Sequence, residues 1–183
     1  MKSLLHRLCV TSLLFFSLIC LFSCSLSSSQ LPDDGTPRII DLAGKERALG
    51  EFFAEHTLLF LWASWCPECV VELSALNSAK RNLSARDLSI VTVAINDDVA
   101  SVRECPPVRN ATYPVLLDVK DQIRSRYPVT SLPTVYLLDR KGTVLPLVDP
   151  EDGKAKNSVS GFREWQSKAG IRAILDSIST GKP

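Results

Sequence analysis

Two cysteines separated by two residues form the pattern in this 183-residue sequence that is best suited to chemistry. Cys66 and Cys69 stand in Ser64-Trp65-Cys66-Pro67-Glu68-Cys69, directly after the wholly apolar run 58–63. Such a pair can exchange thiol for disulfide, bind zinc, or form an inert bridge. The position directly after an apolar strand strengthens the redox interpretation.

A helix is predicted to begin beside Cys66. Pro67 suits the first turn of a helix, and apolar residues recur near helical spacing through residue 76. Unpaired amides and the helix dipole at this end favour an anion, and the thiolate is the attacking form of cysteine. We therefore expect Cys66 to attack a substrate disulfide, and Cys69 to attack Cys66 in turn and release the reduced substrate.

The elements that must position this pair alternate along the chain. Strands are predicted at 38–42, 58–63, 88–95, 113–118, 134–138 and 143–145, and helices at 49–55, from 67 onward, from the capping pair Asp97-Asp98 to about 105, at 119–127, and around 165–178. Pro106-Pro107 is expected to end a helix, and 149–161 is predicted to be a loop. This order predicts an α/β fold, a mixed central sheet flanked by helices.

The N-terminus has the order of a secretory signal. Lys2 and Arg7 precede an uncharged apolar run, 8–22, that ends among serines. Leu21-Phe22-Ser23-Cys24 resembles a bacterial lipobox, which implies cleavage before Cys24 and its lipidation. Two or three acyl chains would hold the protein stably at a membrane. An uncleaved signal anchor and an ordinary cleaved signal are the alternatives.

Three segments are therefore predicted. Residues 1–24 are the signal, the Ser-, Pro-, Asp- and Gly-rich stretch 25–37 is a flexible tether, and 38–183 is one domain of ordinary size. The chain beyond the signal has 19 basic and 20 acidic residues, which gives no electrostatic support for a nucleic-acid partner. Outside the cytoplasm thiols are normally oxidised, so a working dithiol would need an electron donor.

The segment 62–69, Trp-Ala-Ser-Trp-Cys-Pro-Glu-Cys, resembles the active-site segment of thioredoxin-like proteins, particularly the extracytoplasmic TlpA-like and ResA-like group. The resemblance extends through most of 38–145 and implies a thioredoxin-like fold. Cytoplasmic thioredoxins place a buried aspartate six residues before the first cysteine, where this chain has Phe60. That difference favours the TlpA-like branch.

The resemblance also implies supporting site residues. Glu72 falls where the group places a buried glutamate near the cysteines, and its carboxylate could modulate the thiols or relay a proton. The segment 130–134 resembles the family's cis-proline loop, so the bond before Pro133 is expected to be cis, with the loop against the cysteines and open to substrate. Trp65 is expected to shield or present the site, while no cofactor or resident metal is expected.

The expected function is reduction of disulfides in extracytoplasmic proteins, and the resemblance implies a membrane thiol donor and a role in cytochrome c maturation. A disulfide oxidase or isomerase is the first alternative, because the direction depends on thiolate stability, which Pro67-Glu68 does not fix. A zinc site could recruit Cys105 and His56, but neither has paired-ligand spacing. A non-enzymatic copper chaperone would be expected to add a His or Met near the motif, and the sequence has none there. A peroxidase would use a lone cysteine rather than a pair. Cys105 itself is expected to be an inert thiol.

Overall fold

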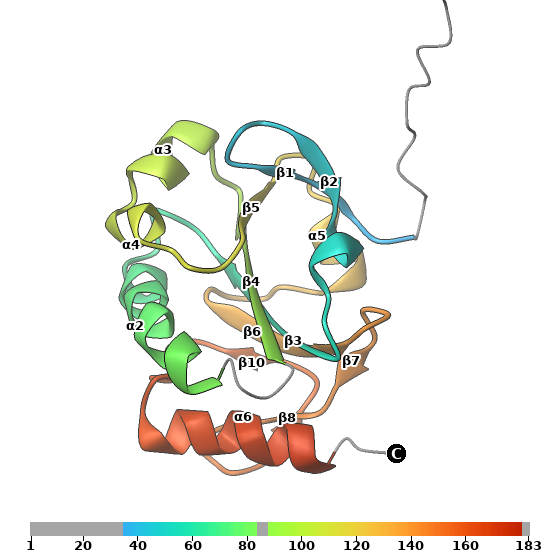
Figure 1. Cartoon of the computed structure of the whole chain (residues 1–183), viewed down its shortest axis with the longest axis vertical. Coiled ribbons are helices and arrows are strands. Elements are labelled where there is room, and N and C mark those ends of the chain that lie inside the picture. Colours follow the sequence, from blue (N-terminus) through green and yellow to red (C-terminus); the bar gives the residue numbers. More distant parts are fainter. Residues whose placement is uncertain (1–34, 84–87, 181–183) are drawn as a thin grey trace, which may run out of the picture. The chain divides into compact units, whose positions relative to one another are not determined.

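The computed structural model describes residues 35–83 and 88–180 (Figure 1). The signal predicted at 1–24, including Cys24, and positions 25–34 of the predicted tether lie outside the described residues. The elements in chain order are β1 (Arg38–Asp41), β2 (Glu46–Ala48), η1 (Leu49–Phe52), β3 (His56–Trp62), α2 (Pro67–Leu83), β4 (Leu88–Ile95), α3 (Val99–Glu104), α4 (Pro106–Arg109), β5 (Val115–Asp118), α5 (Ile123–Arg126), β6 (Thr134–Asp139), β7 (Val144–Leu145), β8 (Leu147–Val148), β9 (Ala155–Lys156), β10 (Val159–Ser160) and α6 (Lys168–Thr180).

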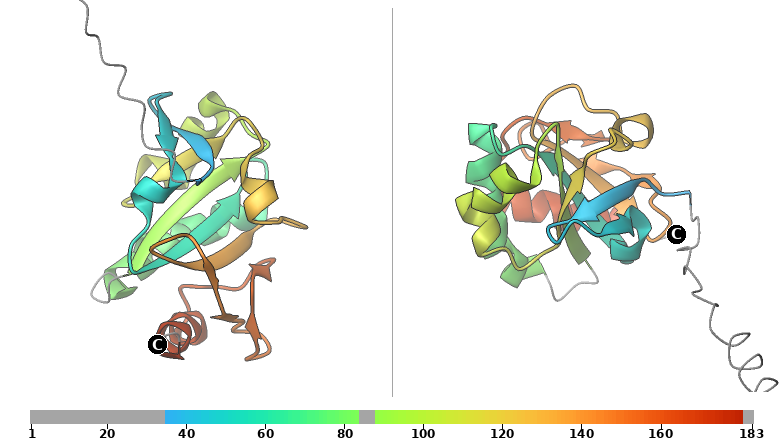
Figure 2. Two further views of the ribbon diagram at one scale, coloured as in Figure 1. Left: turned by 90° about the vertical axis from the view of Figure 1, so that its right-hand side faces the viewer. Right: turned by 90° about the horizontal axis from the view of Figure 1, so that it is seen from above.

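The main sheet has the strand order β10-β6-β3-β4-β5-β1-β2, with β7 paired to β6. Strand β3 runs parallel to β4 and antiparallel to β6, while β4 runs parallel to β5. Helices lie on both sides of this sheet (Figures 1 and 2). The predicted α/β architecture, a mixed sheet flanked by helices, is confirmed.

Strand β3 is buried along its whole length because it carries apolar side chains to both faces of the sheet. Leu58, Phe60 and Trp62 belong to one apolar cluster, together with side chains of α2, α3 and α6. Leu59 and Leu61 belong to a second cluster, which includes Ile123 of α5. Each such side chain contributes about 1.5–3 kcal/mol by burial. The strand that leads into Cys66 is therefore anchored from both sides.

Two predicted helices are shorter than expected. The segment 49–55 forms only the 3-10 turn η1, and 119–127 forms only the four-residue α5. The reason for the second is Asp118, whose carboxylate accepts the amides of Gln122 and Ile123 at 2.9 and 2.8 Å and fixes the turn before α5. Asp121 in that turn has a φ of 51°, which no helix continues through.

The predicted cap and stop around 97–107 are partly confirmed. Asp98 caps α3 by accepting the amides of Ala100 and Ser101. Helix α3 ends before Cys105 as expected, but Pro106-Pro107 then opens the short helix α4. Proline lacks an amide hydrogen, so it can begin a helix as readily as it ends one.

The predicted loop 149–161 contains strands. Residues 147–156 form a hairpin of β8 and β9, with Val148 opposite Ala155, and β10 adds an edge strand beside β6. Helix α6 packs on β8, where the Ser177 hydroxyl accepts the amide of Val148 at 2.8 Å. Figure 2 shows these segments and α6 gathered at one side of the sheet. The prediction of a loop holds for most of 149–161, but it misses the two short strands β9 and β10.

The packed chain begins ahead of the boundary predicted at residue 38. Thr36 is buried, and its hydroxyl accepts the amide of Gly50 at 3.0 Å. The Pro37 carbonyl accepts the amide of Leu49 at 3.0 Å. Positions 35–37 of the predicted tether thus pack on the domain. In the part of the chain that the structure describes, no helix is long and apolar enough to cross a membrane.

Candidate active site

The two cysteines lie where β3 passes into α2. The Cys66 amide donates to the Ala63 carbonyl at 3.1 Å, which closes a turn between the strand and the helix. Pro67 then opens α2, as predicted. The Cys66 and Cys69 sulfurs are bonded, and their Cα atoms lie 5.3 Å apart. The structure therefore represents the oxidised form of the pair.

The two sulfurs differ in their access to solvent. Cys66 is 7% exposed, whereas Cys69 is fully buried at 0%. The Cys69 amide donates to Cys66 Sγ at 3.2 Å, which places a hydrogen-bond donor on the outer sulfur. An incoming sulfur can reach Cys66 but not Cys69. This arrangement supports the roles expected for them, with Cys66 as the nucleophile and Cys69 as the resolving thiol.

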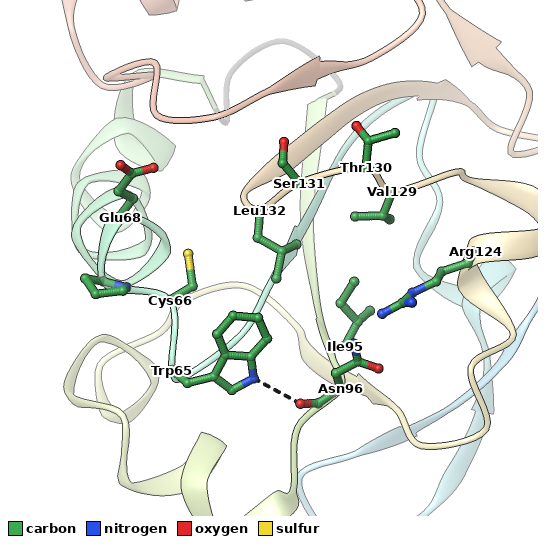
Figure 3. A pocket seen from close by; sticks show the side chains of 11 residues that line it. Trp65, Cys66, Glu68, Ile95, Asn96, Arg124, Val129, Thr130, Ser131 and Leu132 are labelled. Carbon is green, nitrogen blue, oxygen red and sulfur yellow. Dashed lines mark hydrogen bonds between the residues drawn. The ribbon is translucent and has the colours of Figure 1, made fainter.

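A cavity of about 530 Å³ opens beside Cys66 (Figure 3). Its walls come from the start of α2, the end of β4, the helix α5 and the loop before Pro133. The lining residues are Trp65, Cys66, Pro67, Glu68, Ile95, Asn96, Arg124, Val129, Thr130, Ser131 and Leu132. This size is in the range of ligand-binding clefts, and its mixed apolar and polar lining could accept a stretch of polypeptide.

Pro133 follows the loop that faces Cys66 across this cavity. The Leu132–Pro133 peptide bond is cis, as predicted, and Pro133 itself is buried. The loop residues 129–132 therefore approach the outer sulfur from a part of the chain more than sixty positions away. The structure brings together the cysteine pair and the proline loop, which the sequence had associated only by resemblance.

The two tryptophans near the pair have different positions. Trp62 is fully buried in β3, whereas Trp65 is 61% exposed and lines the cavity. The Trp65 indole Nε1 donates to the Asn96 carbonyl at 3.0 Å (Figure 3). This bond fixes the ring at the rim beside Cys66, where its free surface can meet a substrate chain.

Asp97 is a site residue whose role the sequence did not indicate. It was predicted only as part of a helix cap, yet its carboxylate accepts the Ser64 amide at 2.5 Å and the Ser64 hydroxyl at 2.9 Å. These bonds attach the turn before Cys66 to the end of β4. The parallel pairing of β3 and β4 is the signal that could have found it, because Trp62 opposite Ala94 places residue 97 beside residue 64.

Glu72 lies one turn along α2 from Cys69, with its side chain only 1% exposed. Its Oε1 accepts the backbone amides of Arg163 and of Glu164, the latter at 3.0 Å. Its Oε2 is buried without a hydrogen-bond partner among the described residues. Burial raises the pKa of Glu72 to about 7, although the two amide bonds act in the opposite direction. Glu72 does not line the cavity beside Cys66.

The residues that a metal site could have recruited do not gather here. Cys105 is a buried free thiol whose pKa is raised by burial and, to a smaller extent, by Asp97. His56 is buried at the start of β3. Across 35–83 and 88–180, no three His, Cys, Asp or Glu side chains form a group that could hold a metal ion. A raised pKa and burial fit the expectation that Cys105 is chemically quiet.

Curated relatives of this chain share about a quarter to a third of its residues in the matched part. The thiol-disulfide oxidoreductase ResA of Geobacillus kaustophilus is 27% identical over 110 residues, which cover 60% of this chain and 63% of the relative. The thioredoxin-like protein YneN of Bacillus subtilis is 32% identical over 106 residues, 56% of this chain and 61% of the relative. The match thus spans less than two thirds of either relative.

Solved structures show the same fold. A thiol:disulfide interchange protein of the thioredoxin family from Chlorobium tepidum superposes with a TM-score of 0.58 at 20% identity, covering 78% of this chain and 94% of that one. The exposed lipoprotein thioredoxin Etrx1 of Streptococcus pneumoniae gives a TM-score of 0.55 at 20% identity, covering 79% and 98%. The fold is therefore thioredoxin-like, as expected from the resemblance.

A family model matches residues 28–145, a range that includes the cysteine pair, the end of β4 and the cis-proline loop. It ends at the last residue of β7, so the hairpin of β8 and β9, the strand β10 and the helix α6 lie beyond it. Since this range covers well over half of the sequence and contains the whole cavity beside Cys66, the chain belongs to the AhpC/TSA family.

Proposed function

We propose that this protein is a thiol-disulfide oxidoreductase that reduces disulfides of other proteins outside the cytoplasm. The observation that supports it best is the pairing of a reachable Cys66 with a fully buried Cys69 beside an open cavity. Relatives named thiol-disulfide oxidoreductase support the same activity. No cofactor enters this chemistry, because the two thiols themselves supply the electrons.

The reaction uses the two sulfurs in order. In the reduced protein the Cys66 thiolate attacks one sulfur of a substrate disulfide, and the other substrate sulfur leaves as a thiolate that takes up a proton. Cys69 then loses its proton and attacks Cys66 Sγ, which breaks the mixed disulfide and releases the second substrate thiol. Two electrons have passed to the substrate, and the protein holds the Cys66–Cys69 disulfide seen here. A dithiol donor must return two electrons before the next cycle.

We place that donor in a membrane, together with the protein itself. The signal pattern at 1–24 and the lipobox-like segment ending at Cys24 support a lipid anchor, and one structural neighbour is named an exposed lipoprotein. A role in cytochrome c maturation is the more specific form of this proposal. Replacing Cys24 by Ser should move the protein from the membrane fraction to the soluble one; unchanged fractionation would contradict lipidation at this residue.

The proposed direction is tested by the reduction potential of the Cys66–Cys69 couple. We would equilibrate the protein, with Cys105 replaced by Ser, in glutathione or dithiothreitol buffers and follow the two redox forms by thiol labelling. A potential below the glutathione range of about −240 mV supports a reductase fed by a membrane donor. A potential near that of strong oxidants, about −120 mV, would instead favour an oxidase or isomerase. Absence of any reversible couple would overturn the enzymatic proposal.

A further inference from the structure

The segment 147–165, which we name the clasp, contains β8, β9, β10 and the turn that leads toward α6. It lies beyond the residues that the family model matches. The last turn of the clasp contacts α2 through the Glu72 carboxyl, which does not line the open cavity beside Cys66. The clasp also pairs with the strand that follows Pro133, through Ser160 opposite Thr134. Its contact with Glu72 is the one that reaches α2 beside Cys69.

Asp149 ties the two ends of the clasp together. Its carboxylate is 1% exposed and accepts Arg163 Nε at 2.9 Å on one oxygen and Lys156 Nζ at 2.7 Å on the other. The amide of Glu151 adds a third bond at 3.0 Å. Burial alone would raise the pKa of Asp149, but the bonds from Lys156, Glu151 and Arg163 outweigh it and lower the pKa. The Asp149 carboxylate is thus charged, and its bonds hold Arg163 and Lys156 in place.

Arg163 connects Asp149 to Glu72. Its guanidinium binds Asp149, while its own backbone amide and that of Glu164 both donate to Glu72 Oε1. Glu164 adopts a φ of 49°, an unfavourable left-handed conformation for a residue with a side chain. Such a turn is retained only when its surroundings enforce it, and here it directs two consecutive amides at one oxygen.

Burying the Glu72 carboxyl lowers the stability of the fold, which a purely structural role would not explain. Its Oε2 is buried without a partner among the described residues, and an unsatisfied buried polar atom costs about 1–3 kcal/mol. An apolar side chain of similar size would avoid that cost. The two amides bond the carboxyl directly, and the charges of Arg163 and, from its own helix, Glu68 act on its pKa from a greater distance, Arg163 lowering it and Glu68 raising it. None of them neutralises it by direct side-chain contact.

We propose that the Asp149–Arg163 pair is a positioning device for the cysteine reaction: it keeps the turn 162–164 closed over Glu72, so that this carboxyl stays out of water one helical turn from Cys69. The buried carboxylate can then accept the proton that Cys69 releases when it attacks Cys66, and it returns that proton when the pair is reduced again. This inference rests on the proposed oxidoreductase function, because the Asp149–Arg163 pair would position the group that accepts the proton in the resolving step of that reaction.

The test compares Asp149→Asn with Glu55→Gln in the full chain, kept in detergent. Both changes remove one acidic charge from an ion pair, but Glu55 pairs with Arg140 at 3.5 Å on the exposed surface, where both side chains are more than half exposed. For each protein we would measure the Glu72 carboxyl titration by carbon NMR in the oxidised form. We would also measure the pH dependence of disulfide reduction.

In Asp149→Asn the clasp should open and water should reach Glu72. The Glu72 midpoint should then fall from about 7 toward the ordinary 4.5, and the acid limb of the pH–rate profile should move down by at least about one pH unit. Glu55→Gln should leave both unchanged. An unchanged midpoint in a folded Asp149→Asn protein would overturn the proposal, and so would a lowered midpoint with an unmoved pH–rate profile.

Two further variants keep the test decisive if Asp149→Asn does not fold. Lys156→Gln removes only the half-exposed partner of Asp149 and should shift Glu72 less than loss of the Arg163 bond. Arg163→Lys keeps the charge and the backbone amide but loses the guanidinium geometry, and it should shift the Glu72 midpoint in the same downward direction. If the unmodified protein reduces no disulfide at all, the proposed function fails, while the NMR titration still decides whether the clasp buries Glu72.

Discussion

At the residue scale, the proposed reaction assigns two different steps to two chemically identical side chains. The difference comes from position alone: Cys66 borders the cavity, and Cys69 is sealed in the core. In the proposed reaction a substrate sulfur therefore bonds first to Cys66, and the mixed disulfide persists until Cys69 reacts.

Serine substitutions should separate these steps. Cys69→Ser should trap a mixed disulfide between Cys66 and its substrate, detectable by mass spectrometry after acid quenching, because the resolving thiol is gone. Cys66→Ser should form no such adduct and should lose disulfide reduction by about 10³-fold or more. Cys105→Ser, which removes the other buried thiol of the described residues, is the control and should behave as the unmodified protein. Adduct formation through Cys69 would reverse our assignment.

The two tryptophans offer a matched pair of changes at the same scale. Trp65→Ala should raise KM for a protein disulfide while changing the free energy of unfolding by only about 0.5 kcal/mol, because the ring is mostly exposed at the cavity rim. Trp62→Ala should cost about 3–5 kcal/mol, because it empties a fully buried site. Steady-state kinetics and urea unfolding measure both. A large stability loss for Trp65→Ala would mean that its ring supports the fold.

At the element scale, the turn that presents Cys66 depends on the neighbouring strand. Asp97, just beyond β4, holds the amide and hydroxyl of Ser64 in the turn between β3 and α2. Asp98, the next residue, instead caps α3. Adjacent carboxylates thus serve two elements, one at the site and one remote from it.

Alanine at each position should separate these roles. Asp98→Ala should cost about 1 kcal/mol of stability through the lost helix cap and leave the rate of disulfide exchange nearly unchanged. Asp97→Ala should destabilise the fold by a similar or somewhat larger amount, since bonds to charged groups contribute about 1.5–3 kcal/mol, but it should also slow exchange. Thermal unfolding and stopped-flow reduction of a model disulfide distinguish them. Equal exchange rates in the two variants would exclude a site role for Asp97.

At the scale of the whole molecule, stability should depend on the protonation of Glu72. Its folded-state pKa of about 7 lies above the ordinary 4.5, so the folded protein holds this proton more tightly than the unfolded chain does. The resulting stabilisation is complete below about pH 4.5 and is lost as the pH rises through about 7. The change amounts to about 3 kcal/mol.

Glu72→Gln should remove this pH dependence, because the amide does not titrate. Relative to the unmodified oxidised protein, the variant should gain stability between pH 5 and pH 8, as measured by the denaturant midpoint at each pH. Glu55→Gln, at an exposed ion pair, provides the control and should show no such gain. A constant difference across this range would show that Glu72 titrates at its ordinary value in the fold.

Much of this protein follows from local sequence patterns. The apolar run before Cys66, the β-branched run of β4 and the proline at the start of α2 each encode an element through their own side chains, and all three are present as predicted. The cysteine spacing, the cis-proline loop and the cap at Asp98 also lie within short stretches of chain. The site was therefore predictable wherever its parts are local or belong to a family pattern.

Tertiary structure alone decided what surrounds Glu72. Its partners, the amides of Arg163 and Glu164, lie 91 and 92 positions away along the chain. The strands β9 and β10 were missed because the segment 149–161 around them is polar and turn-rich, which is typical of an exposed loop, although Asp149 is buried against Lys156 and Arg163. Composition shows that a side chain is charged, but whether water or another charge satisfies it depends on distant residues that only the folded chain brings together.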